Sequence, residues 1–115
     1  MIDFNKEFVS ALKKVLPTHH ELTLTKGTKT PCLSYQEANN YVTDDGDNIE
    51  YSRVVYTVKV WGNDIALLNK YAGEVDKTLR PLGFKRTASG ELYDRASTMI
   101  HKILTYEANA LEIFN

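Results

Sequence analysis

The spacing of apolar positions predicts two helices. Near the start of the chain apolar side chains recur every three or four residues, which places them on one face of a helix. We predict this helix over residues 3 to 16, with Asp3 as its cap and Pro17 beyond its end. The same spacing returns after residues 62 to 64 and predicts a second helix that ends near Arg80. The apolar positions are Phe4, Phe8, Ala11, Leu12 and Val15 in the first helix and Ile65, Leu68, Ala72, Val75 and Leu79 in the second.

Alternating apolar and polar positions predict the strands. The strongest signal covers residues 49 to 61, where β-branched and aromatic residues dominate and Val54, Tyr56, Val58 and Val60 share one face. Weaker signals predict strands over residues 21 to 25, 31 to 38, 84 to 88 and 99 to 108, and a short final strand within 109 to 115. Residues 92 to 94 are expected to extend a hairpin. Turns are predicted at residues 26 to 29 and 89 to 90, and a polar loop at residues 39 to 48.

The order of these elements is α-β-β-β-α-β-β. Because consecutive strands are not separated by helical crossovers, the sheet should be mostly antiparallel, with two helices on one face. The sequence therefore predicts an α+β fold and a single domain over residues 1–115. We expect a core that includes Phe8, Leu12, Val54 or Val55, Val58, Leu68, Val75, Phe84 and Ile103.

Composition excludes several classes of protein. The chain has 115 residues, of which 43% are hydrophobic and 25% charged, and these are ordinary values for a soluble globular domain. The net charge of -1 argues against a protein whose main task is to hold nucleic acid. No apolar run approaches the roughly 18 to 20 residues that cross a bilayer, and no signal peptide is visible at the N-terminus. We expect a cytosolic domain without a membrane partner.

The residues that most often carry chemistry form no convincing set. Cys32 is the only cysteine, so an internal disulfide and a multi-cysteine zinc site are excluded. A catalytic thiolate needs a nearby base or positive charge, and the sequence places none convincingly beside Cys32. His19 and His20 are adjacent and fit a solvated pair in a connector, whereas His101 fits a partly buried histidine on a strand. We predict no catalytic, cofactor-binding or metal-binding residues and no enzymatic activity.

An acidic segment stands out within the predicted polar loop. It contains Asp44, Asp45 and Asp47 around Gly46. Aligning Gly46 with the sixth position of an EF-hand leaves Asp45 as the single carboxylate at a ligand position, so the calcium pattern fails. Weak binding of a divalent cation, a solvated turn and a charged loop that faces a partner remain open.

Three segments, in their order and spacing, resemble the tail-terminator (tail-completion) proteins of long-tailed bacteriophages and prophages. The first is Thr-Pro-Cys-Leu-Ser-Tyr-Gln-Glu at residues 30–37, ahead of the polar segment. The second is Tyr-Thr-Val-Lys-Val-Trp-Gly at residues 56–62, just before the second helix. The third combines Leu-Arg-Pro-Leu-Gly-Phe-Lys-Arg at residues 79–86 with the later Glu-Leu-Tyr-Asp and His-Lys of the closing hairpin. With the first helix, these segments cover nearly the whole chain.

The resemblance implies a structural role in the virion. Members of that family are non-enzymatic α+β subunits that form a hexameric ring on the head-proximal end of the tail tube, stop its growth and present the head-joining surface. The implied partners are further copies of the chain, the tail-tube protein and a head-completion or connector protein. DNA would pass through the lumen without specific binding. The protein would be in the host cytoplasm during assembly and afterwards in the virion tail, without a cofactor.

Two groups of residues are candidates for partner contacts in such a ring. Asp44, Asp45 and Asp47 suit a lumen, because basic walls would bind the DNA that must pass. The mixed face of the residue 49–61 strand suits ring contacts, because Tyr and Trp are favoured at interface cores. Its candidate residues are Tyr51, Arg53, Lys59 and Trp61.

Other functions compete with this interpretation. The chain could be another small head-to-tail connector or minor structural protein of a phage. It could also be a small hydrolase that uses Cys32 or His101. A third alternative is a nucleic-acid-binding module, in which tyrosines and Trp61 stack on bases between basic residues.

Overall fold

The computed structural model describes residues 4–25, 27–44, 49–94 and 99–113. Its elements are α1 (Asn5–Lys13), β1 (Thr18–His20), the 3-10 helix η1 (Glu21–Thr23), β2 (Cys32–Asp44), β3 (Ile49–Gly62), α2 (Ile65–Leu79), the 3-10 helix η2 (Arg80–Leu82), β4 (Lys85–Asp94) and β5 (Met99–Ile113).

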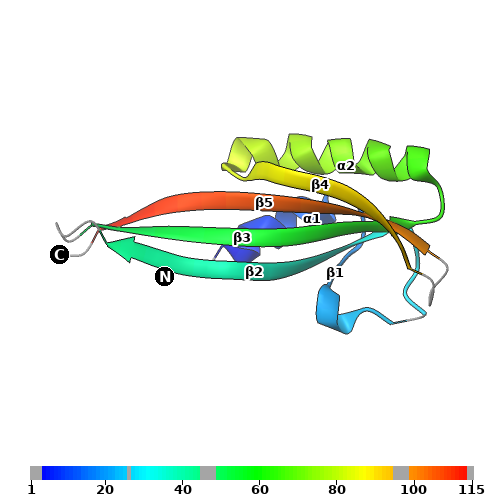
Figure 1. The fold of residues 1–115 in the computed structure, drawn as a ribbon, viewed down its shortest axis with the longest axis horizontal. Coiled ribbons are helices and arrows are strands. Elements are labelled where there is room, and N and C mark those ends of the chain that lie inside the picture. Colours follow the sequence, from blue (N-terminus) through cyan, green and yellow to red (C-terminus); the bar gives the residue numbers. More distant parts are fainter. Residues whose placement is uncertain (1–3, 26, 45–48, 95–98, 114–115) are drawn as a thin grey trace.

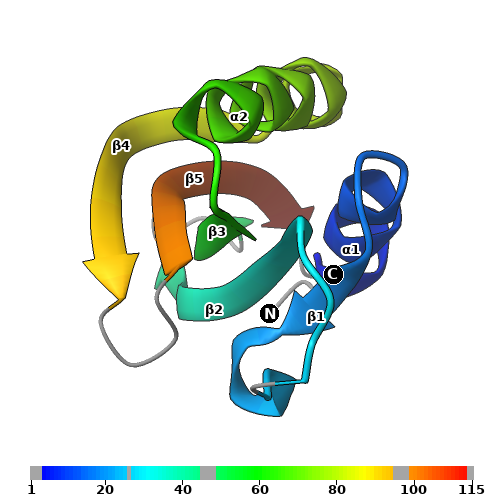
Figure 2. The same ribbon diagram turned by 90° about the vertical axis from the view of Figure 1, so that its right-hand side faces the viewer.

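The predicted α+β architecture is confirmed. The five strands form one sheet in the order β1-β2-β3-β5-β4, and the sheet curves round the two helices, which lie on one side of it (Figures 1 and 2). β1 pairs with β2 in parallel, while the β2–β3, β3–β5 and β4–β5 pairings are antiparallel.

Both helices bury most of the apolar positions that their sequences predict, whereas Ile65 in the first turn of α2 is 45% exposed. In α1 the buried residues are Phe8, Ala11 and Leu12, and in α2 they are Leu68, Ala72, Val75 and Leu79. The carboxylate of Asp64 caps α2 by accepting hydrogen bonds from the amides of Ala66 and Leu67. Pro81 lies within η2, and Gly83 then takes a left-handed conformation (φ 91°) that redirects the chain into β4.

The core lies between the helices and the sheet. The ring of Phe8 stacks on Tyr56 with centroids 3.9 Å apart, and Phe84 meets Phe8 edge-on at 4.9 Å. The side chains of Val54, Val58, Leu68 and Val75 are also buried, as predicted. Ile103 was wrongly placed in this core. Strand alternation puts Leu104 on the helix side of β5, so Ile103 lies on the opposite face and is half-exposed.

The strand predicted at residues 21 to 25 is wrong, because Glu21–Thr23 form η1. The first strand is instead β1, which contains His19 and His20, so the two histidines do not lie in a loop. Local hydrogen bonds then turn the chain into η1. The Nδ1 atom of His20 accepts from the amide of Leu22, and the Thr23 hydroxyl donates to the His20 carbonyl oxygen. Leu22 is consequently 81% exposed.

Three strands are longer than the sequence predicts. Residues 39–44 continue β2 by pairing with β3, so the predicted loop is wrong over that stretch; residues 45–48 lie outside the described residues. Residues 89 and 90 continue β4 and do not form a turn. Residues 109–113 continue β5 and are not a separate strand. At residues 39–44 and 89–90, pairing with a neighbouring strand outweighs the weak strand preference of polar residues and glycine.

The long strands produce an elongated molecule of 51 × 25 × 22 Å. The far ends of β2, β3 and β5 extend beyond both helices and beyond β4 (Figure 1). We call this three-stranded extension the arm and define it as residues 39–44, 49–53 and 108–113. Its register is continuous with that of the body, so the arm belongs to the same sheet.

Candidate interaction surface

The face of the sheet that points away from the helices is the first candidate surface. We call it the open face. Its central residues alternate with the buried core residues of β3 and β5, and each is half-exposed apart from the more buried His101. They are Arg53, Val55, Thr57, Lys59 and Trp61 from β3 and His101, Ile103, Thr105 and Glu107 from β5.

Aromatic and polar contacts order one end of the open face. Trp61 and His101 are register partners, and their rings lie 4.3 Å apart between centroids. The indole Nε1 of Trp61 donates a 2.9 Å hydrogen bond to the hydroxyl of Ser34. The ammonium group of Lys59 lies 5.7 Å from the centroid of the Trp61 ring, within the range of a cation–π contact. Trp61 is therefore held in one orientation.

Glu21 links η1 to this cluster. One carboxylate oxygen accepts from the Ser34 hydroxyl at 2.6 Å, and the other accepts from the Lys59 ammonium at 2.7 Å. Burial raises the pKa of the Glu21 carboxyl, but the hydrogen bonds from Lys59 and Ser34, with the positive charge of Lys59 and His101, lower that pKa below its ordinary value. Glu21 therefore stays ionised and ties η1 to the sheet.

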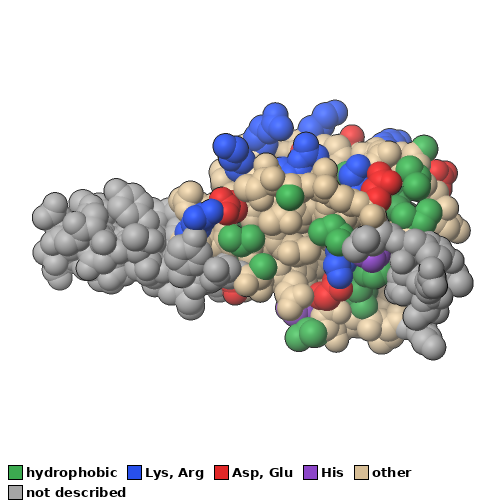
Figure 3. Space-filling view, in the orientation of Figure 1, with side chains coloured by type: hydrophobic (Ala, Val, Ile, Leu, Met, Phe, Trp, Pro, Cys, Tyr) green, Lys and Arg blue, Asp and Glu red, His purple; other side chains and the backbone are tan. Residues whose placement is uncertain are grey.

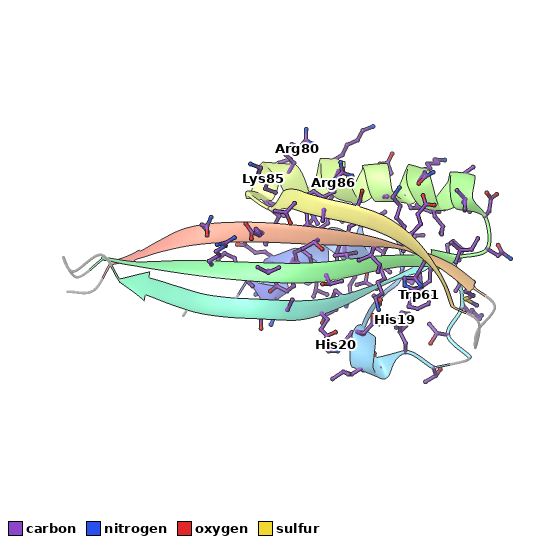
Figure 4. The ribbon with its side chains drawn as sticks, viewed as in Figure 1. His19, His20, Trp61, Arg80, Lys85 and Arg86 are labelled. Carbon is purple, nitrogen blue, oxygen red and sulfur yellow. The ribbon has the colours of Figure 1, made fainter. Side chains whose placement is uncertain are left out.

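Arg53 forms an ion pair with Glu107 at the base of the arm. Figure 4 labels Trp61, which belongs to β3, and His19 and His20, which belong to β1. The structure thus brings the predicted contact residues Arg53, Lys59 and Trp61 onto one face. Each of them also makes an ion pair or a hydrogen bond with another residue of the same chain. Their role in binding a partner stays a prediction.

Of the remaining predicted contact residues, the structure describes Tyr51 and Asp44, and both belong to the arm. Tyr51 pairs in register with Thr43 and Leu111, and Asp44 pairs with Glu50. Asp45 and Asp47 lie outside the described residues. Asp44 is therefore separated along the sheet from Lys59 and Trp61, which lie towards the opposite end of β3.

The geometry does not favour nucleophilic chemistry at the residues weighed from the sequence. Burial raises the pKa of the Cys32 thiol, and that side chain is 1% exposed. Ser34 shares hydrogen bonds with Glu21 and Trp61 but has no exposed surface, so a substrate cannot reach its hydroxyl. His101 is 7% exposed, which agrees with the predicted partly buried histidine.

Within the described ranges, no three His, Cys, Asp or Glu side chains gather in a way that could hold a metal ion. Of the described helices, none is both long enough and apolar enough to cross a membrane. A depression of about 300 Å³ lies over β4 and β5, lined by Ala88, Ser89, Gly90, Glu91, Ile103 and Thr105. Glu91 is the one ionisable side chain in this lining.

A second polar cluster joins α2 to the sheet and was not predicted. The Tyr106 hydroxyl donates to Asp76, whose other carboxylate oxygen lies 3.2 Å from Nη1 of Arg86. Burial and the Asp76 contact raise the pKa of Tyr106, so its hydroxyl remains a donor. Tyr106 and Asp76 are 30 residues apart in sequence, and no local pattern indicates such a contact.

No protein-family model matches the chain, and no curated protein matches it.

Proposed function

We propose that this protein is a tail-terminator subunit of a long-tailed phage or prophage. By its resemblance to that family, it forms a ring of six copies on the head-proximal end of the tail tube. The observation that carries the proposal is the arm. Its three strands extend beyond both helices and beyond β4, so neither described helix covers them (Figure 1). A neighbouring subunit gives the arm something to pack against.

The edges of the arm support self-assembly. Beyond Tyr35, β2 pairs with β3 alone among the described strands, and beyond Glu107, β5 likewise pairs with β3 alone. Each edge carries backbone amide and carbonyl groups that can pair with another chain. Two edges on opposite sides of one arm suit head-to-tail contacts, which close into a ring when the rotation between subunits allows it.

The chemistry of the open face agrees with a structural role. The groups weighed as nucleophiles are buried, whereas the half-exposed side chains of the face are of mixed character and include Trp61, Arg53 and Lys59. A near-neutral subunit can pack against many copies without strong mutual repulsion. Such a ring would join the tail-tube protein on one side and a head-completion protein on the other, with DNA passing through its lumen.

Another head-to-tail connector is the alternative within the same class, because it would use the same kind of ring. Gene order separates the two roles: a terminator gene should lie just before the gene for the major tail-tube protein. A connector gene would lie with the genes for head completion.

Cryo-electron microscopy of the neck of purified virions tests the proposal. We expect a ring of this fold, with six copies, between the last tube ring and the head. A neck in which every ring is built from other chains, in virions that lack this protein by mass spectrometry, would overturn it.

A further inference from the structure

An apolar side chain projects from the turn that follows β1. Leu22 lies in η1 and is 81% exposed, and Figure 3 shows hydrophobic surface projecting at the lower margin of the molecule, in the region of η1. A single exposed leucine is common on soluble proteins and needs no explanation by itself. This one differs because its turn is held in place and because the same chain has a depression that fits it.

Hydrogen bonds fix the turn that carries Leu22. The amide of Leu22 donates to Nδ1 of His20, and the Thr23 hydroxyl donates to the carbonyl oxygen of His20. The carboxylate of Glu21 accepts two further hydrogen bonds from side chains of the sheet. A segment that is already ordered loses little conformational freedom when it enters the surface of a partner, and this favours binding.

The depression over β4 and β5 lies on the open face and measures about 300 Å³. Ile103 and Thr105 belong to that face, and their register partners on β4 are Gly90 and Ala88. Because directly paired residues share a face of the sheet, these two small residues leave Ile103 and Thr105 uncovered. A cavity of roughly 150 Å³ is enough for a benzene molecule, so the depression has room for the side chain of a leucine.

The turn and the depression lie at opposite margins of one sheet. Ser34, which binds Glu21, begins a row of register partners that crosses the sheet from β2 to β4. The row consists of Ser34, Lys59, Ile103 and Gly90. Three strand spacings, roughly 14 Å, separate its ends. The high exposure of Leu22 shows that it does not fill the depression of its own chain, whereas a second copy can bring its turn over that depression.

The charges of the two surfaces are complementary. Glu91 is the one ionisable side chain in the lining of the depression, and it is 45% exposed. Residues 22–31 contain two lysines and no acid, and Lys29 is exposed. Glu21 is already in an ion pair within its own chain. A second copy therefore meets the depression without repulsion between like charges.

We propose that the depression binds Leu22 of a second copy of this chain. The contact is head-to-tail, because a copy that gives its Leu22 keeps its own depression for a further copy. One leucine covers far less than the roughly 1,000 Å² of a stable interface, so the contact should be weak between two free copies. The inference goes beyond the proposed function, because a contact between copies does not require a phage tail.

Photo-cross-linking of the full chain tests the contact. A diazirine analogue of leucine replaces Leu22 in a chain grown with heavy nitrogen, which is mixed with the ordinary chain so that mass spectrometry identifies links between copies. At high protein concentration we expect links between copies to residues 88–91 and 103–105. The same analogue in place of Leu82, which is 48% exposed, is the control and should give no links to those residues.

The outcomes that would overturn the inference are equally defined. They are links between copies that join position 22 to other residues, or no links between copies at all. Links within one copy only would mean that the turn closes over its own depression, and they would also overturn the inference.

Two substitutions remove opposite halves of the contact. Leu22→Ala removes the projecting side chain. Gly90→Val fills the depression without a clash, because a Cβ atom at Gly90 would meet no atom within 4 Å. Each variant alone should weaken self-association by at least about tenfold in sedimentation velocity experiments. Leu82→Ala is the matched control and should change it by less than about twofold.

A mixture of the two variants sharpens the test. Leu22→Ala keeps an intact depression and Gly90→Val keeps Leu22, so an equal mixture should form pairs and nothing larger. An absence of pairs, with both variants folded by circular dichroism, would contradict the contact.

The test of this contact is independent of the test of the proposed function. If the links are absent while a ring of this chain is found in the neck, the inference is wrong and the proposed function survives. If the links are found while virions contain no such ring, the contact stands and the proposed function is wrong.

Discussion

At the scale of single residues, burial on the helix side followed from periodicity, because Phe8, Leu12, Leu68 and Val75 repeat at helical spacing and all are buried. Ile103 was mistaken for core because an apolar residue on a strand gives no sign of which face is covered. The contacts of Glu21 were not predictable either. Its partners Ser34 and Lys59 lie 13 and 38 residues away, and only the fold brings them together.

Leu68 is a strong test of the core. This residue of α2 is only 2% exposed. Leu68→Ala should therefore lower the free energy of unfolding by about 2 to 5 kcal/mol, through lost burial and the cavity left behind. Leu22→Ala is the matched control, since Leu22 is 81% exposed and should change stability by less than about 0.5 kcal/mol. Urea denaturation measures both. Equal losses for the two variants would contradict the placement of Leu68.

Glu21 should give the stability of the fold a dependence on acid pH. Its pKa in the folded chain lies below the ordinary value of 4.5, so its stabilising contacts are present above that value and are lost as pH falls through the folded pKa. The advantage of the native chain over Glu21→Gln should therefore shrink as pH falls from about 6 to about 3. Urea denaturation at both pH values measures this change. A constant difference would show that the Glu21 carboxylate makes no ionic contribution.

At the scale of elements, the existence and order of helices and strands were predictable, whereas the lengths of β2, β4 and β5 were not. Residues 39–44 are mostly polar and resemble a loop locally, yet β3 offers a continuous partner for them. Residues 89–90 likewise pair with β5. Strand propensity depends on the partner, and a partner distant in sequence leaves no local signal.

Gly83 is the element boundary whose backbone matters most. With φ at 91°, it lies in the left-handed region, where a side chain is strained, so Gly83→Ala should lose about 1 to 3 kcal/mol. Gly73→Ala is the control, because Gly73 is an exposed position in α2 where an added methyl group would meet no atom within 4 Å. That control should gain roughly 0.5 to 1 kcal/mol from higher helix propensity. Thermal denaturation that showed no difference between the variants would contradict the left-handed turn.

At the scale of the whole molecule, the account depends on the arm and on what covers it. Sequence analysis predicted partner contacts at the acidic residues and along β3, but it placed Asp44 in a loop, whereas Asp44 continues β2 opposite Glu50. It did not predict that Arg80, Lys85 and Arg86 lie together, because Arg80 follows the end of a helix whereas Lys85 and Arg86 begin a strand (Figure 4).

The length of phage tails tests the central claim most directly. In a phage that lacks this gene, electron microscopy should show overlong tails that are not joined to heads, and the wild-type gene supplied in trans should restore normal length. Tails of normal length that fail to join heads would favour the connector role instead. Tails of normal length that carry heads would contradict the proposed function.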